Sequence, residues 1–94
     1  MLFFYNEQIK VINSNLDVFD ETIIKHLHKI LKLSKFDIIL FGTGKNLKKI
    51  PDKLNRYLIE QKYNFEIMCT NSAIKTHNVL LSENRNLVSI IKLI

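Results

Sequence analysis

Two short segments of the chain hold side chains whose types and spacing could do chemistry. Each follows an apolar run: the first is Gly42-Thr43-Gly44, and the second spans residues 68–80. In α/β proteins, turns at the carboxyl ends of parallel strands are where ligand sites usually form. The Thr70 hydroxyl and the N–H groups of Asn71 and Ser72, at the start of a predicted helix, could hold an anion there.

The glycine turn does not match the common nucleotide-binding motifs. A phosphate loop needs a glycine five positions before the Gly44-Lys45 pair and a hydroxyl residue after it, but Ile39 and Asn46 stand there. The dinucleotide fingerprint fails as well, since its third glycine would fall on Leu47. The turn is therefore either a structural feature that needs glycine's backbone freedom or one side of an anion-binding crevice.

Metal and nucleophile chemistry find little support in the residue pattern. His26 and His28 are two positions apart, so on a helix they point roughly 200° apart and cannot share a metal ion. Cys69 is the lone cysteine, which excludes an internal disulfide and fits a reducing compartment. His77 lies about two helical turns beyond Cys69, too far to act as its base. We expect no metal, no cofactor and no cysteine catalysis.

The predicted third helix carries polar side chains within its apolar stripe. An unpartnered buried polar group costs about 1–3 kcal/mol, so these side chains need hydrogen-bond partners. We hypothesise that Asn78 bonds backbone groups of the Gly42–Gly44 turn. Thr70 is expected to cap the helix, although it and Thr76 are also open to a ligand-binding role. The predicted stripe comprises Ala73, Ile74, Leu80 and Leu81, with His77 and Asn78 between them.

Hydrophobic periodicity predicts an alternation of strands and helices along the chain. Short β-branched and aromatic runs indicate strands, while apolar residues at helical spacing after Asp20 and Pro51 indicate helices. Because strands and helices alternate, the crossovers should be right-handed and the sheet at least partly parallel. The predicted strands are 2–5, 8–12, 37–41, 64–68 and 87–94, the helices are 21–33, 51–61 and 70–82, and residues 13–15 form a turn.

Length and composition indicate a single domain, residues 1–94, and a hydrophobic share of 47% excludes a disordered chain. A domain of this size buries only about 60–65% of its unfolded surface, which leaves room for homo-oligomerisation. The net charge of +5 invites a nucleic-acid partner, but only Arg56 and Arg85 supply the guanidinium groups that such sites favour. We therefore interpret the charge as a solvated surface. With no run of ~20 apolar residues and no signal peptide, we expect a soluble cytoplasmic protein.

Taken together, the motifs resemble those of the small α/β domain shared by a mitochondrial respiratory complex I assembly factor, an adipogenesis-associated cytosolic protein and many uncharacterised bacterial proteins. In that family a strand ends in Gly-Thr-Gly and a proline opens the next helix. The motif Met-x-Thr-x-x-Ala-x-Arg-Thr-Tyr-Asn-x-Leu follows, and then Glu-x-Arg. Lys75 stands at the family's arginine and His77 at its tyrosine. The resemblance covers about residues 36–94, at Gly42-Thr43-Gly44, Pro51, Met68, Thr70, Ala73, Thr76, Asn78, Leu80, Glu83 and Arg85.

The resemblance implies a three-layer α/β domain with a mixed central sheet, about three helices and an added N-terminal β element. It also implies no established enzymatic activity and a protein partner. The first hypothesis is therefore a non-enzymatic bacterial protein that binds another protein and assists assembly of a membrane respiratory complex. The second is a small anionic-ligand binder or enzyme, whose crevice lies between the Gly42–Gly44 turn and the helix near Thr70, with charge from Lys45 or Lys75.

Overall fold

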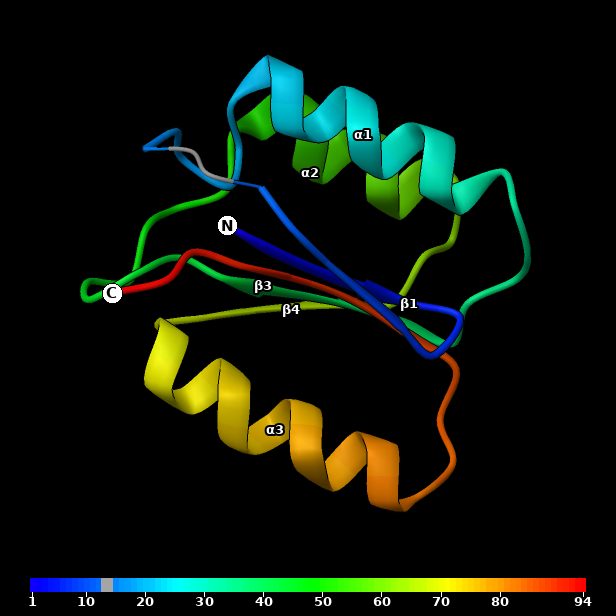
Figure 1. Ribbon diagram of the computed structural model, residues 1–94. Coiled ribbons are helices and arrows are strands. Elements are labelled where there is room, and N and C mark those ends of the chain that lie inside the picture. The colour runs from blue at the N-terminus through cyan, green and yellow to red at the C-terminus, as the bar shows by residue number, and fades with distance from the viewer. Residues whose placement is uncertain (13–14) are drawn as a thin grey trace.

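The described residues of the chain fold into one five-stranded sheet with helices on both faces, the mixed α/β architecture expected from the sequence (Figure 1). The computed structural model describes residues 1–12 and 15–94, so the turn predicted at 13–15 lies partly outside the described residues. The strands are β1 (Leu2–Tyr5), β2 (Gln8–Val11), β3 (Ile38–Gly42), β4 (Phe65–Met68) and β5 (Leu87–Ile91). The helices are α1 (Glu21–Leu31), α2 (Asp52–Glu60) and α3 (Thr70–Ser82).

The sheet combines a parallel part with an antiparallel hairpin. Its strand order is β2-β1-β5-β3-β4, so the last strand of the chain lies in the centre. Strand β3 pairs in parallel with β4 and β5, while β1 pairs antiparallel with β5 and β2. The carboxyl ends of β3, β4 and β5 therefore meet at one end of the sheet. The Gly42–Gly44 turn, the start of α3 and the C-terminus gather there (Figure 1).

Helices α1 and α2 cover one face of the sheet and enclose most of the core (Figure 1). The Asp20 carboxylate caps α1 by accepting the Thr22 N–H at 3.0 Å, as the sequence predicts for a residue at this position. Each buried aliphatic side chain on these helices contributes about 1.5–3 kcal/mol through removal from water. Those side chains are Ile23, Leu27, Ile30 and Leu31 of α1 and Leu54 and Leu58 of α2.

Helix α3 covers the other face alone, with a different stripe from the one predicted. Thr70, Ala73 and Leu80 are its buried residues, whereas Ile74 and Leu81 are 42% and 37% exposed. The inclusion of those two in the core stripe is wrong because α3 is rotated so that Thr70, Ala73 and Leu80 face the sheet. A Cβ added to Gly42 would lie 3.0 Å from the Ala73 Cβ, so a glycine here permits the close helix–strand approach.

Two elements end two or three residues earlier than predicted. Helix α1 ends at Leu31 rather than residue 33, and β5 ends at Ile91 rather than residue 94. Leu33 is 63% exposed and Ile94 is 73% exposed. The apolar character of these residues extended the predicted elements, but their side chains lie outside the core.

Candidate functional site

The Gly42–Gly44 turn meets the start of α3 through one buried side chain, Thr70. The Thr70 Oγ1 accepts the Gly44 N–H at 2.9 Å and donates to the Lys92 carbonyl at 2.5 Å. In return, the Thr70 N–H donates to the Gly44 carbonyl at 2.8 Å. Thr70 is 2% exposed. We call this arrangement of Gly44, Thr70 and Lys92 the Thr70 junction, and it connects the ends of β3 and β5 to α3.

Thr43 organises the loop that leaves β3. Its N–H donates to the Met68 carbonyl at 2.8 Å, which continues the parallel pairing beyond the strand. Its hydroxyl donates to the Asn46 carbonyl at 2.8 Å and accepts the Lys48 N–H at 3.2 Å. The loop therefore folds back around a buried hydroxyl, and that hydroxyl is committed to partners within the chain.

An ion pair connects this loop to the segment before α1. The Lys48 Nζ lies 2.6 Å from the Asp17 Oδ2. Burial raises the pKa of the Asp17 carboxyl, but the hydrogen bonds from Lys48 and from the Phe19 N–H outweigh it, and the pKa lies below its ordinary value. Both side chains are partly exposed, so the pair contributes no more than about 1 kcal/mol.

The start of α3 differs from the prediction in its capping residue. Cys69, not Thr70, is the N-cap, and Thr70 is the first residue of the helix. Thr70 turns its hydroxyl to the sheet because the Gly44 N–H and the Lys92 carbonyl need a partner there. Asn71 and Ser72 are exposed beside it. The Ser72 hydroxyl lies 3.5 Å from the Cys69 Sγ and lowers the pKa of the thiol.

The hypothesis that Asn78 bonds the glycine turn is wrong. Asn78 is exposed, and Thr70 makes the contact with the turn instead. Lys75 is exposed on α3. Arg85 follows that helix, with its Nε 3.9 Å from the Asp37 Oδ2 at the amino end of β3, the opposite end of the sheet from the turn.

His77 and Thr76 pack between α3 and the sheet. The His77 Nδ1 lies 2.7 Å from the Oγ of the fully buried Ser89, and its ring meets the Phe4 ring edge-on at 4.7 Å. The Thr76 hydroxyl lies 3.2 Å from the Met68 sulfur. Burial lowers the pKa of His77. The structure thus brings together only Gly42, Thr43, Gly44, Thr70 and the adjacent Asn71, while Lys75, Thr76, His77, Asn78 and Arg85 are spread along and beyond α3.

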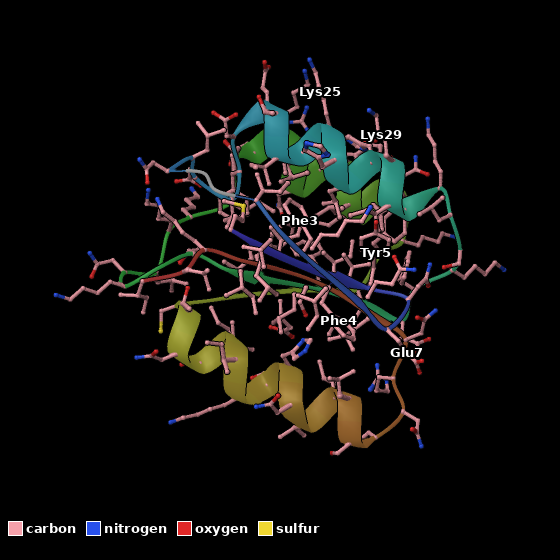
Figure 2. All side chains as sticks on the ribbon, viewed as in Figure 1. Phe3, Phe4, Tyr5, Glu7, Lys25 and Lys29 are labelled. Atoms are coloured by element: carbon pink, nitrogen blue, oxygen red, sulfur yellow. The ribbon has the colours of Figure 1, made fainter. Side chains whose placement is uncertain are left out.

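Sequence reasoning missed the groove between α1 and α2, which has a volume of about 670 Å³. We call it the α1–α2 groove. Its apolar residues are Phe19, Ile24, Pro51 and Leu54, and its polar ones are Glu21, Lys25, His28, Lys53 and Tyr57. Lys25 projects from α1 away from the sheet (Figure 2). Ile24 and Tyr57 line the groove and are only half-buried, so this space is a groove and not part of the closed core.

The sequence profile of a protein family of unknown function, DUF498/DUF598, matches residues 2–91. The chain belongs to this family. The match includes the N-terminal hairpin and so reaches beyond residues 36–94, where the motifs alone carry the resemblance. A curated relative, the 13 kDa major membrane protein of Francisella tularensis subsp. holarctica (strain LVS), is 35% identical over 66 residues, which are 70% of this chain. The alignment covers 53% of that relative, so the chain spans about half of its length.

Solved structures of other bacterial proteins share the fold of this family member. An outer membrane protein from Bartonella henselae has a TM-score of 0.81 at 24% identity, over 99% of this chain and 78% of that one. A protein from Rhodopseudomonas palustris also has a TM-score of 0.81, at 19% identity, over 99% of this chain and 68% of that one. A Mth938-like domain from Bordetella pertussis has a TM-score of 0.69 at 16% identity, over 96% of this chain and 71% of that one. Among the described residues of this chain, no helix is long and apolar enough to cross a membrane.

Replacing Thr70 tests the junction directly. Thr70→Val keeps the shape but leaves the Gly44 N–H and the Lys92 carbonyl unpaired, so we expect the free energy of unfolding to fall by roughly 2–4 kcal/mol. Thr70→Ser keeps the hydroxyl and should lose no more than about 1 kcal/mol. Denaturant unfolding of the two variants measures the difference, with the exposed Asn78→Ala as a control expected within about 0.5 kcal/mol of wild type. Equal stability of the valine and serine variants would contradict the hydrogen-bond account.

The burial of His77 predicts a pH dependence of stability. Its pKa is lower in the folded state than its ordinary value of 6.5, so the unfolded chain binds more protons and stability falls as the pH drops through 6.5. His77→Phe should remove this part of the slope. Ser89→Ala should lower stability at every pH but keep the slope, because the titrating ring remains. Unfolding free energies between pH 5 and about 8 measure both variants, and an unchanged slope in His77→Phe would count against this assignment.

Proposed function

We propose that this chain is a non-enzymatic cytoplasmic protein that binds another protein through the α1–α2 groove. The observation that carries the proposal is the groove itself, in which apolar side chains lie between the exposed lysines of two helices. A mostly apolar centre with a charged rim is the usual anatomy of a protein interface. The resemblance to respiratory complex assembly factors supports a partner among the subunits or assembly factors of such a complex.

The charges around the groove favour an acidic partner. Lys25 and Lys53 line it, whereas Glu21 is the carboxylate among its described lining residues. Farther along the same helical layer, Lys29 of α1 and Lys32, the C-cap residue of that helix, are also exposed. Complementary charges at an interface steer association and exclude wrong partners more than they add affinity. We therefore expect the partner to bring apolar side chains flanked by carboxylates.

The alternative, an anionic ligand held at the glycine turn, has no comparable support. The Gly44 N–H and the hydroxyls of Thr43 and Thr70 are hydrogen-bonded within the chain. A ligand there would have to displace those bonds before gaining its own. The Thr70 junction therefore supports a structural role for Thr43, Gly44 and Thr70.

Affinity capture of the tagged protein from its native cell, read by mass spectrometry, tests the proposed function. We expect respiratory complex subunits or their assembly factors to co-elute with the wild type. The paired change Lys25→Glu and Lys53→Glu should abolish their recovery, because it reverses the charge on both sides of the groove.

Lys75→Glu is the control: it makes one lysine-to-glutamate change on the exposed side of α3, half the net-charge change of the paired variant. It should leave the recovery unchanged. If the wild type elutes without such partners, or if the paired variant recovers them as well as the wild type does, the proposal fails.

A further inference from the structure

We infer that the outer edge of β2 binds an extended acidic segment of a partner protein by strand addition. This surface is separate from the α1–α2 groove, and the inference stands or falls independently of the proposed function. Strand β2 is one of the two edge strands of the sheet, β4 being the other, and all four residues of β2 are exposed. None of the residues in the described parts of the chain pairs with its outer side.

The hairpin register shows which backbone groups face that edge. Asn6 and Glu7 have φ values of 50° and 61°, typical of a two-residue type I′ turn. At the other end of the hairpin, the N–H groups and carbonyls of Met1 and Ile12 exchange hydrogen bonds of 2.8 and 2.6 Å. Bonded and non-bonded pairs alternate in an antiparallel ladder. Lys10, two residues before Ile12, therefore bonds inward to β1.

Ile9 and Val11 consequently turn their N–H and carbonyl groups outward. Their side chains are 62% and 66% exposed and stand opposite Phe4 and Leu2, on the side of the sheet where α3 lies. Helix α3 packs on β3, β4 and β5 and leaves these two side chains uncovered. An edge strand with unpaired backbone groups and apolar side chains is a template for pairing with another strand.

The opposite face of the same strand is cationic. Lys10 lies on the α1 side, with its Nζ 5.5 Å from the centre of the Tyr5 ring. Figure 2 shows Phe3 and Tyr5 pointing from β1 toward α1, and Phe4 pointing the other way. A hollow of about 250 Å³ between this hairpin and α1 is lined by Lys10, Lys29 and His26 over Phe3 and Tyr5. The described residues that line it include no carboxylate.

These two faces together select the partner. A strand added to β2 places side chains opposite Ile9 and Val11 on one face and a side chain opposite Lys10 on the other. The favourable pattern is therefore apolar–acidic–apolar, with the carboxylate beside Lys10 and near Lys29. A second copy of this chain is disfavoured in the register that would match both apolar side chains, because pairing Ile9 with Val11 across a two-fold axis would set Lys10 against its own copy. Main-chain hydrogen bonds would supply affinity and the carboxylate would supply selectivity.

A nuclear magnetic resonance titration of the isotope-labelled full chain tests the inference. The probes are two blocked peptides, Thr-Val-Glu-Val-Thr and Thr-Val-Lys-Val-Thr, added to millimolar concentration. We expect saturable shifts of the Ile9 and Val11 amides with the glutamate peptide, and binding of the lysine peptide about fivefold weaker. Lys10→Glu, an exposed substitution whose amide spectrum should otherwise match wild type, should reverse this preference.

Four results would overturn the inference. They are no shift at the Ile9 and Val11 amides, shifts confined to another part of the sheet, a peptide preference unchanged by Lys10→Glu, and a protein dimer joined through β2. The paired Lys25 and Lys53 variant should bind the glutamate peptide as the wild type does, because those residues lie at the α1–α2 groove. Failure of the groove proposal would thus leave this result intact, and the reverse also holds.

Discussion

The hydroxyl of Thr70 holds three separate parts of the chain together, and the rest of the fold depends on that arrangement. Strand β5 is the last strand in sequence and the central one in the sheet, so its position depends on contacts with residues that are distant in sequence. At its exit, the Lys92 N–H donates to the Gly42 carbonyl at 2.9 Å, and the Lys92 carbonyl accepts the Thr70 hydroxyl. The absence of a side chain at Gly42 lets Ala73 bring α3 against the same place.

The Thr70 junction gives the Gly42–Gly44 turn a structural role, although the position of that turn is typical of a ligand site. Gly42, Thr43 and Gly44 lie at the carboxyl end of parallel strands, where α/β proteins commonly bind ligands. Here the same groups complete the hydrogen bonding of the turn, the helix start and the chain beyond β5. The surfaces that we propose for a partner lie elsewhere. In the α1–α2 groove, mostly half-buried or buried apolar side chains lie beside lysines, and at the outer edge of β2 the exposed Ile9 and Val11 flank Lys10.

The sequence was sufficient for the elements and the fold class, because periodicity is a local property. It could not place Thr70, since its preference for a helix cap competes with two tertiary hydrogen bonds that only the folded chain supplies. The predicted contact of Asn78 with the turn is wrong for a similar reason. The close approach of Ala73 to Gly42 sets the rotation of α3, and that approach is a tertiary contact. The groove and the β2 edge depend on helix separation and on strand order, which no local pattern in the chain encodes.

Native-state hydrogen exchange of the Gly44 amide, with and without inorganic phosphate, tests the central claim most directly. If the Thr70 junction is a closed structural contact, this amide exchanges only through global unfolding, and phosphate changes neither its rate nor its chemical shift. An amide that exchanges through small local fluctuations, or that shifts saturably as phosphate is added, would show that the turn is open to ligands. That result would contradict the structural account of the junction.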